Sequence, residues 1–414
     1  MSEQVTSSPV VGGEGTESQP APREQTPSAG FLLDHDTNAK PVISVVIPTL
    51  NEEQGIAHCI EAVETALNEL RLPGEVIVSD GSTDRTPEIA REMGAVVVEP
   101  DAPGYGYAYR YAFEHARGEV VVIGDADTTY DFSELPTLLE RLESTDADIV
   151  LGSRLDGEIK PGAMPALHQY VGNPLLTRFL NAFYDAGVSD AHSGFRVIRR
   201  EVIDELELTT DGMEFASEMI MAAAAQDYRI EEVPITYHER EGEATLDSFR
   251  DGWRHVKFMT VNAPNYLFSL PGGLWMLVGL GVMGASYSTT PAGGLHLGLH
   301  TMIAGSLLTI LGWQVWSLGV LATVASNPIQ SPSDRITQFI IGNVSLEHGT
   351  LLGTGLATLG VVLVAGVGLR SVGVETGGAT VMKEFTVACT VTVLGLLMVF
   401  ESFFFGLVHP DTST

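Results

Sequence analysis

The chain has 414 residues, and its 53 acidic against 22 basic side chains give a formal net charge of −31 at pH 7. A surface this acidic repels the phosphates of nucleic acids, so we expect no nucleic acid partner. Two cysteines, Cys59 and Cys389, are too few for a disulfide framework and lack the spacing of metal ligands, so both are expected to serve packing.

The acidic residues are concentrated in one part of the chain. Residues 41–262 hold 41 acidic and 17 basic side chains, and lysine occurs only four times in the whole sequence. In concentrated salt, dense carboxylates hold hydration while the salt screens their mutual repulsion. The composition therefore predicts a protein of a halophilic archaeon, with an acidic mesophilic protein as the alternative.

Residues 1–40 are rich in Ser, Thr, Pro, Gly, Glu and Gln, which predicts a disordered leader. The segment has neither the basic start nor the long apolar run of a signal peptide. We therefore expect the globular part that follows to stay in the cytosol.

Residues 41–243 alternate between short apolar runs and amphipathic helical patterns. Strands are expected at residues 42–49, 75–79, 95–99, 119–123 and 147–151, with helices between them, the first of which Asn51 is expected to cap. Strands that alternate with helices predict an α/β domain with a mostly parallel sheet covered on both faces.

Residues 244–262 predict an amphipathic helix at the membrane interface, or alternatively an ordinary linker helix. Apolar and basic side chains recur there at helical spacing on neighbouring faces. The apolar set is Leu246, Phe249, Trp253 and Val256, and the basic set is Arg250, Arg254 and Lys257.

Residues 263–414 predict an all-α transmembrane domain of about four helices. Residues 258–333 contain no Asp, Glu, Lys or Arg, a run of 76 positions that suits two membrane spans joined by a short loop and no soluble domain. Spans are expected near residues 266–288, 301–325, 350–369 and 385–408. Glu401 lies inside the last one, where an ionisable group is a functional candidate or reaches back to the interface.

Four predicted strand ends carry polar residues. Ligands of open parallel sheets bind beyond the carboxyl ends of the strands. One such end is an ordinary turn, but four at one edge of a sheet indicate a site. The segments are residues 48–52, 79–84, 124–127 and 152–154. Gly104 and Gly106 precede a helix, so their backbone either approaches a ligand closely or forms a plain loop.

Asp125 and Asp127 stand two residues apart on one of these loops and can turn toward one hard cation. Mg²⁺ or Mn²⁺ bound in this way keeps open positions for pyrophosphate oxygens. The ion then neutralises charge on a leaving nucleoside diphosphate. The alternative, a solvated turn, leaves the neighbouring strand ends unexplained.

Four motifs together resemble those of family 2 glycosyltransferases, most of all the polyprenyl-phosphate sugar synthases of the dolichyl-phosphate mannose or glucose synthase type. They are Val-Val-Ile-Pro-Thr-Leu-Asn-Glu-Glu at 45–53, Ser-Asp-Gly-Ser-Thr-Asp at 79–84, Gly-Asp-Ala-Asp at 124–127 and Ser-Gly-Phe-Arg at 193–196. The likeness covers residues 42–260. It implies a GT-A fold (Rossmann-like) and an inverting, metal-dependent transfer from UDP- or GDP-hexose to polyprenyl (dolichyl) phosphate.

Candidate site residues follow from these motifs and the segments beside them. The resemblance implies that Asp125, Asp127 and Arg196 are catalytic, the first two as metal ligands. Nucleotide-sugar binding is expected of Pro48, Asn51, Glu52, Asp80, Gly104, Gly106 and Arg154. Contact with the acceptor phosphate is expected of His168, Asn173, Ser193 and Arg240.

Two departures from the family pattern stand out. Relatives often continue the metal motif with Leu-Gln, where this chain has Thr128-Thr129. Relatives also often have Ser-Lys where Ala244-Thr245 follow here, so one phosphate-facing cation is missing. The departures leave the donor and its phosphate contacts open.

The acceptor chemistry fits the absence of an obvious Ser/His/Asp or Cys/His nucleophile set. A monoalkyl phosphate, with a second pKa of about 6, is largely dianionic at neutral pH. It needs positioning and charge stabilisation rather than a general base.

The sequence therefore predicts a multi-pass enzyme of the cell membrane with a cytosolic catalytic domain. The alternatives are a transferase acting on another lipid or lipid-linked glycan, and a sugar- or lipid-binding membrane protein without catalysis. The sugar, the base and the oligomeric state stay open.

Overall fold

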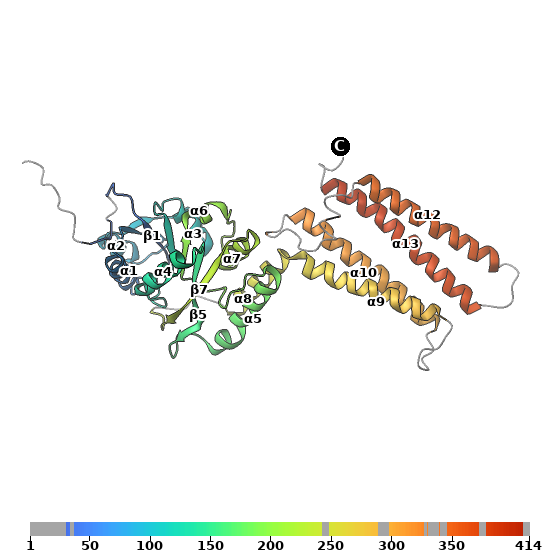
Figure 1. Ribbon diagram of the computed structural model, residues 1–414, viewed down its shortest axis with the longest axis horizontal. Coiled ribbons are helices and arrows are strands. Elements are labelled where there is room, and N and C mark those ends of the chain that lie inside the picture. Colours follow the sequence, from blue (N-terminus) through green and yellow to red (C-terminus); the bar gives the residue numbers. More distant parts are fainter. Residues whose placement is uncertain are drawn as a thin grey trace, which may run out of the picture.

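The computed structural model describes residues 30–33, 37–241, 248–288, 298–326, 329, 339, 346–371 and 378–408. It shows two parts, an α/β domain and a group of long apolar helices, and the two parts lie end to end (Figure 1). Helix α8 (Ser248–Val261) lies between the two parts.

A seven-stranded sheet forms the centre of the α/β domain. The strands are β1 (Ile43–Thr49), β2 (Gly74–Asp80), β3 (Val96–Val98), β4 (Val120–Ile123), β5 (Ile149–Ile159), β6 (Arg196–Arg199) and β7 (Ile230–Tyr237). Their order is β3-β2-β1-β4-β6-β5-β7, and only the pairs that β6 makes with β4 and β5 are antiparallel. The prediction of a mostly parallel α/β sheet is confirmed. The sequence pattern does not predict β6 or β7, because β6 carries an arginine at each end and β7 contains two glutamates and a proline.

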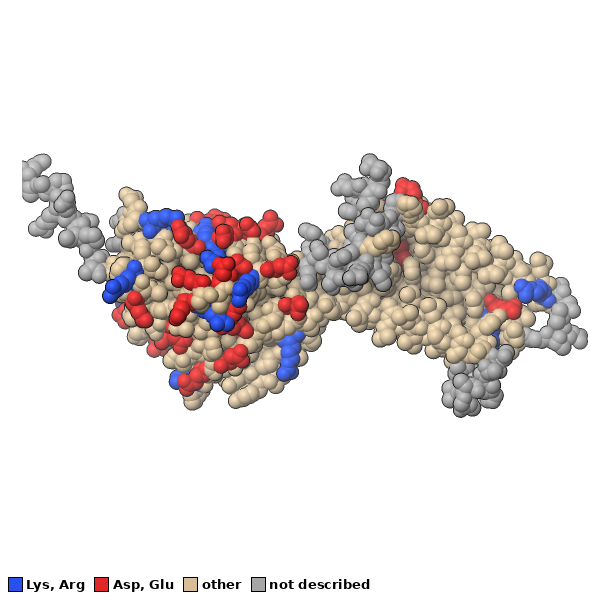
Figure 2. Space-filling view, in the orientation of Figure 1, with Lys and Arg blue, Asp and Glu red and all other residues tan. Residues whose placement is uncertain are grey.

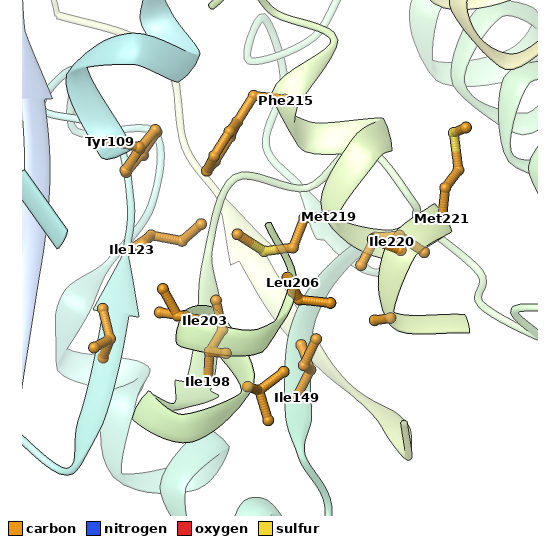
Figure 3. Close-up of a cluster of buried hydrophobic side chains, with 14 of the residues drawn as sticks. Tyr109, Ile123, Ile149, Ile198, Ile203, Leu206, Phe215, Met219, Ile220 and Met221 are labelled. Atoms are coloured by element: carbon orange, nitrogen blue, oxygen red, sulfur yellow. The ribbon is translucent and has the colours of Figure 1, made fainter. Parts of the chain in front are cut away.

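Helices cover both faces of the sheet. They are α1 (Ile56–Leu70), α2 (Thr86–Glu92), α3 (Tyr105–Phe113), η1 (Phe132–Glu134), α4 (Leu135–Thr145), η2 (His168–Gly172), α5 (Asn173–Tyr184), α6 (Arg200–Glu205) and α7 (Phe215–Ala225). Because successive strand residues point to opposite faces, Val46 enters one buried cluster and Val45 the other. In the first cluster the ring of Tyr109 on α3 stacks on that of Phe215 on α7, with centroids 5.1 Å apart (Figure 3).

Part of the predicted leader packs on the domain. The Leu33 N–H donates to the Gly74 carbonyl over 2.8 Å, and the Gly74 N–H donates to the Phe31 carbonyl over 3.0 Å. Phe31 and Leu32 also pack against the core, so residues 30–33 differ from the expectation of disorder because their apolar side chains find a place to be buried. Residues 1–29 and 34–36 lie outside the described part.

Four helical segments are long and apolar enough to cross a membrane, Asn265–Tyr287, Leu299–Ala325, Leu346–Ser371 and Gly378–Val408. They correspond to η3 (Asn265–Ser269) with α9 (Leu270–Tyr287), α10 (Leu299–Ser326), α12 (Leu346–Ser371) and α13 (Gly378–Val408). The prediction of about four apolar helices after the α/β domain is confirmed.

The apolar helices pair as two hairpins, α9 with α10 and α12 with α13 (Figure 1). Glycines let the backbones approach closely, which is the usual basis of helix contact in membranes. A Cβ on Gly312 of α10 would stand 2.3 Å from the Met276 nitrogen of α9, and one on Gly395 of α13 would stand 2.3 Å from the Ala357 nitrogen of α12. The contacts of the first hairpin repeat every seven residues, at Gly272, Gly279, Gly305, Gly312 and Gly319.

Polar side chains join the two hairpins through α10 and α13. The hydroxyls of Ser306 and Thr390 lie 2.6 Å apart. Glu401 accepts a hydrogen bond from the Trp313 indole N–H over 3.0 Å and one from the Ser317 hydroxyl over 2.7 Å. The structure therefore gives the Glu401 carboxylate two partners on α10, a contact between the two hairpins.

Candidate active site

The candidate site lies where the strand order reverses. β1 has β2 on one side and β4 on the other, which is the switch point at which open α/β sheets bind ligands. Thr49 and Asp80 are register partners at the ends of β1 and β2, and the Thr49 hydroxyl donates to Asp80 Oδ1 over 2.7 Å. Pro48, one residue before Thr49, is the register partner of Ser79 on β2. The Asp80 carboxylate is thus buried and held at the edge of the sheet.

The loops that follow β1 and β2 are tied to each other. Asn51 adopts a φ of 60°, a conformation that asparagine tolerates better than most residues. Its Oδ1 accepts a hydrogen bond from the Thr83 N–H over 2.9 Å, and the Glu52 N–H donates to the Thr86 hydroxyl over 3.0 Å. The expected helix cap at Asn51 is wrong, because α1 begins later, at Ile56. Its side chain joins two loops of the site instead.

Each of the two expected metal ligands after β4 has one carboxylate oxygen held by the protein. The Tyr105 hydroxyl donates to Asp125 Oδ1 over 2.9 Å. Thr129 donates to Asp127 Oδ1 through its N–H over 3.2 Å and through its hydroxyl over 2.6 Å. Thr129 is one of the departures from the family pattern, and in this chain its hydroxyl positions the second carboxylate.

Burial raises the pKa of Asp125 to about 7, with the neighbouring Asp127 carboxylate as the second cause. The Tyr105 hydrogen bond and the charges of Arg154 and Arg240 act in the opposite direction. Two carboxylates this close and this buried resist being charged together unless a cation joins them.

The carboxylate pair fits a hard divalent cation. Mg²⁺ is commonly bound through one or two carboxylates together with substrate phosphates and water. The Oδ1 atoms are occupied by protein donors, and Asp125 Oδ2 lies beside Gly194, where a Cβ would stand only 2.9 Å from it. In the described ranges, no group of three or more His, Cys, Asp or Glu side chains is placed to hold a metal ion. An ion bound by Asp125 and Asp127 would therefore take its other ligands from water or a bound diphosphate.

Arg240, just after β7, contacts one carboxylate of this pair and a third acidic side chain. Its Nη2 lies 2.5 Å from Glu52 Oε1, and its Nη1 lies 3.4 Å from Asp127 Oδ2. The segment that carries it runs beside the loop of the metal motif, since the His238 N–H donates to the Thr129 carbonyl over 2.9 Å. The sequence assigns Arg240 to the acceptor phosphate, whereas the structure places it beside one expected nucleotide-sugar residue and one expected metal ligand.

Arg154 does not face the site as expected. Its Nε donates to Asp190 Oδ2 over 2.7 Å and its Nη2 to Asp190 Oδ1 over 2.8 Å. Both side chains are buried, and the guanidinium lies 5.3 Å from the centre of the Tyr237 ring. Because both oxygens of Asp190 accept hydrogen bonds from Arg154, the charge of the arginine is neutralised inside the fold. Arg154 therefore ties β5 to the segment before β6 and is not presented to a donor phosphate.

Arg196 and Ser193 also point into the protein, contrary to their expected phosphate contacts. The Arg196 side chain is fully buried; its Nε donates to the Ser193 carbonyl over 2.9 Å, and its Nη2 donates to two further main-chain carbonyls over 3.1 and 3.0 Å. The Ser193 hydroxyl donates to the Gly152 carbonyl over 2.6 Å. These bonds shape the loop that places Gly194 against Asp125. Arg196 and Ser193 therefore support the site from the protein interior and do not line it.

Gly104 and Gly106 lie against the segment that carries Thr210 and Asp211. Gly104 has a φ of 144°, and a Cβ on it would stand 2.3 Å from the Asp211 carbonyl oxygen. A Cβ on Gly106 would stand 2.4 Å from the Thr210 carbonyl oxygen, while its N–H donates to the Asp211 carbonyl over 2.9 Å. Glycine is required at both positions because two protein segments touch, and the contact of the exposed Gly104 with a nucleotide sugar stays a prediction.

His168 and Asn173 lie at the start of η2 and of α5, in a segment with exposed apolar side chains. Leu167 is 65% exposed and Tyr170 72% exposed. The Asn173 amide contacts the Met164 sulfur over 3.4 Å. In the part of the chain that the structure describes, no hydrogen bond joins either residue to the paired carboxylates, so their contact with an acceptor phosphate stays a prediction.

Helix α8 is fastened to the catalytic domain on one face and exposed on the other. The Ser217 hydroxyl lies 2.8 Å from His255 Nδ1 of α8 and 3.1 Å from His192 Nε2. Trp253 and Lys257 are exposed. Leu246 lies outside the described residues, as do the side chains of Phe249 and Arg250. Of the expected apolar set, Trp253 is exposed and Val256 is half-buried, and His255 adds a buried polar contact that the sequence pattern does not show. The placement of this helix at the membrane interface stays a prediction.

Sequence reasoning missed the residues that position the metal motif. Tyr105, Thr129 and Tyr130 all do so, the last by accepting a hydrogen bond from the Gly194 N–H over 2.7 Å. The aromatic residues look like core packing in a single sequence. Only Thr129 gave a signal, as a hydroxyl two residues after the second aspartate, a spacing at which side chain and main chain bond locally.

A mostly parallel sheet with paired carboxylates at its switch point, continued by four helices able to cross a membrane, defines a membrane-anchored glycosyltransferase. Residues 44–207 match glycosyl transferase family 2, and residues 320–409 match the glycosyltransferase family 2 C-terminal transmembrane region. The chain belongs to glycosyltransferase family 2, as the motifs indicated.

Known proteins share one or both parts of the chain. The low-salt glycan biosynthesis hexosyltransferase Agl6 of Haloferax volcanii is 53% identical over 382 residues, 91% of either chain. The dolichyl-phosphate hexose transferase of the same organism is 39% identical over 212 residues, 51% of this chain and 89% of that protein. Among solved structures, glucosyl-3-phosphoglycerate synthase from Mycobacterium tuberculosis, in complex with Mn²⁺, UDP and glucosyl-3-phosphoglycerate, has a TM-score of 0.43 and 24% identity, covering 54% of this chain and 80% of that one.

Proposed function

We propose that this enzyme transfers a hexose from a UDP- or GDP-hexose to polyprenyl (dolichyl) phosphate at the cytosolic face of the cell membrane, with inversion at the anomeric carbon. One observation carries the proposal. Asp125 and Asp127, each with one oxygen held by a protein donor, follow β4 at the switch point, in a chain that ends in four apolar helices. The relative in Haloferax volcanii that is named a dolichyl-phosphate hexose transferase supports the choice of acceptor.

The donor would lie along the edge formed by β1, β2 and β4. Asp80, whose Oδ1 already accepts from Thr49, would accept from the base or ribose, with Pro48 and Glu52 beside the nucleotide. A Mg²⁺ or Mn²⁺ ion held by Asp125 and Asp127 would neutralise charge on the departing diphosphate.

The acceptor would be the nucleophile without help from a protein base. A phosphate oxygen of the dianionic lipid head group forms the new bond to the anomeric carbon as the bond from that carbon to the diphosphate breaks. The electron pair leaves with the nucleoside diphosphate, and no proton has to move. The protein's task is therefore to orient two anions and to stabilise their charge.

The molecular surface supports acceptor delivery from the membrane. Charged side chains spread over the visible face of the α/β domain, whereas the visible face of the apolar helices is almost free of them (Figure 2). Where the two parts meet, the Phe183 ring of α5 stacks on the Tyr266 ring of η3 at 4.8 Å. Leu167 and Tyr170 are exposed at η2, which packs on α5, and Trp253 is exposed on α8, which contacts η3 at the start of the first span. Such side chains suit the lipid interface.

The domain limits expected from the sequence are part of the proposal. Residues 41–243 would form the catalytic unit, residues 244–262 the interfacial helix and residues 263–414 the membrane anchor. The acidic, lysine-poor composition and two relatives from Haloferax volcanii support a halophilic source.

A second candidate acceptor is a lipid-linked glycan. The relative that covers 91% of this chain is named for glycan biosynthesis. In that case the nucleophile would be a sugar hydroxyl, which has to lose a proton, and a protein base would be required.

A transfer assay tests the proposal. Membranes that contain the protein are incubated with labelled UDP- and GDP-hexoses, and label is followed into the lipid extract, with Asp127→Asn membranes as the control. We expect label in a lipid of one phosphate and one hexose. Label only in larger glycolipids would favour the second candidate, and no label in lipid would contradict both.

A further inference from the structure

Arg240 holds two acidic side chains of the site at once. One nitrogen lies 2.5 Å from Glu52 Oε1 and another lies 3.4 Å from Asp127 Oδ2. All three side chains are largely buried, with 24% of the Arg240 side chain and 12% of each carboxylate exposed. In such surroundings their attraction is screened much less than on an open surface.

The guanidinium of Arg240 lies where a divalent ion bound to Asp127 would also bring positive charge. Asp127 Oδ1 accepts both hydrogen bonds from Thr129, so Oδ2 is the oxygen left for a cation, and Arg240 lies beside it. A divalent ion at this oxygen would meet a cation already beside it. Like charges at this separation repel, so the two cannot both hold Asp127 at full strength.

The guanidinium is also incompletely satisfied where it lies. Its Nε is buried and has no hydrogen-bond partner in the described part of the protein. A buried donor without a partner disfavours the arrangement that contains it. A bound diphosphate offers several acceptor oxygens to an arginine, which recognises such groups through paired hydrogen bonds.

We propose that Arg240 is an exchangeable counter-ion, which neutralises Glu52 and Asp127 in the empty site, releases Asp127 to the arriving divalent ion and then turns to the diphosphate of the donor. The inference rests on the proposed function and assigns an order to its binding steps. Arg240 follows the segment whose His238 N–H bonds to the Thr129 carbonyl, so the exchange would take place beside the metal motif itself.

The proposal predicts effects of opposite sign on two ligands. Without the arginine, Asp127 is available to the ion from the start, so metal alone binds more tightly. The diphosphate loses a cationic partner, so the nucleotide binds more weakly. If Arg240 were purely structural, its removal would weaken the binding of both metal and nucleotide. If it were only a ligand of the diphosphate, its removal would leave the binding of metal alone unchanged.

The test uses the purified full-length protein in detergent and three variants. Arg240→Gln removes the charge, Arg240→Lys retains it, and Arg141→Gln removes the same charge from a surface ion pair with Glu231. Free Mn²⁺ is measured by electron paramagnetic resonance during titration without nucleotide. UDP and GDP are then titrated at saturating Mn²⁺ by calorimetry.

We expect Arg240→Gln to bind Mn²⁺ alone roughly threefold to tenfold more tightly than the wild type. It should bind the preferred nucleotide about tenfold more weakly. Arg240→Lys should bind Mn²⁺ like the wild type because it keeps the charge, and should bind the nucleotide less tightly than the wild type because lysine cannot make the paired hydrogen bonds. Arg141→Gln should match the wild type for both ligands. Unchanged or weaker Mn²⁺ binding by a folded Arg240→Gln protein would overturn the exchange while leaving the metal site in place. A wild-type protein that binds no Mn²⁺ would overturn the proposed metal site itself, and the exchange with it.

Discussion

The hydroxyl of Tyr105 donates a hydrogen bond to Oδ1 of Asp125 over 2.9 Å. One turn further along α3, the Tyr109 hydroxyl donates to the Gly124 carbonyl over 3.2 Å. A single helix therefore holds both the main chain and a carboxylate of the loop after β4. Partners of this kind orient metal ligands and are nearly as important to the metal site as the ligands themselves.

Replacing Tyr105 by Phe removes this hydrogen bond and keeps the ring. We expect Mn²⁺ affinity or transfer to fall roughly 10- to 100-fold, the usual effect of losing a partner of a metal ligand. Tyr107→Phe is the matched control, because its hydroxyl bonds to Asp101 away from the metal motif. Equal Mn²⁺ affinity and transfer in the two variants would mean that Tyr105 does not orient Asp125.

Asp127→Asn and Asp125→Asn should each abolish transfer while the protein stays folded and membrane-bound. The reason is that the proposed metal, which both hold, would offset the charge of the leaving diphosphate. Label transfer to lipid and the melting temperature are measured on the same preparations, together with wild type in excess EDTA. Near-full transfer by either variant, or by the wild type in EDTA, would refute the metal assignment.

Asp125→Asn should also stabilise the metal-free protein at alkaline pH. The pKa of Asp125 is raised to about 7 in the fold, whereas an unfolded aspartate titrates at about 3.9. Between these values the folded state binds the extra proton, so the stability contributed by this group is present at low pH and is lost as pH rises through 7. Asparagine carries no such penalty.

We expect Asp125→Asn to melt roughly 2–4 °C above the wild type in EDTA at pH 8, the shift that about 1 kcal/mol produces in a domain of 150–250 residues. The difference should shrink as the pH is lowered toward 5. A difference that is independent of pH would indicate a packing effect and no titration of Asp125.

The excess of acidic residues predicts stabilisation by salt. Residues 41–262 carry 24 more acidic than basic side chains, and at low ionic strength their repulsion opposes the compact state. The melting temperature of the full-length protein in detergent should rise as KCl is increased from about 0.2 M to about 2 M, since salt shortens the range of this repulsion. A flat or falling curve would contradict the proposed adaptation to salt.

Glu401 should stabilise the contact between the two helical hairpins. Glu401→Leu leaves the Trp313 indole N–H without its acceptor and removes one of the two acceptors near the Ser317 hydroxyl, the other being the Gln314 carbonyl at 3.0 Å. We expect a loss of about 1 kcal/mol, seen as a lower melting temperature in detergent, with Glu401→Gln closer to the wild type because it retains an acceptor. Glu384→Leu, whose carboxylate lies 3.9 Å from Arg370 at the far end of α13, is the control. Equal melting of all three variants would show that Glu401 does not join the hairpins.

The sequence by itself determined the architecture and the family. Hydropathy and the alternation of apolar runs are local, so the mostly parallel sheet and the four apolar helices could be predicted from short windows of the chain. Asp125 and Asp127 were identified for the same reason, because their spacing is written in a few consecutive residues.

Only the tertiary structure decided which neighbouring side chains face the site. Arg154 and Arg196 stand in motifs that suggest phosphate contact, yet the first pairs with Asp190 and the second with main-chain carbonyls. A local pattern does not say whether an arginine finds a partner inside the fold. Arg240 shows the converse, because Glu52, its partner, lies 188 residues away in the chain. Contacts at that separation exist only after the sheet has brought β1, β4 and β7 into one layer, so the arrangement of charges around the carboxylate pair belongs to the fold and not to any motif.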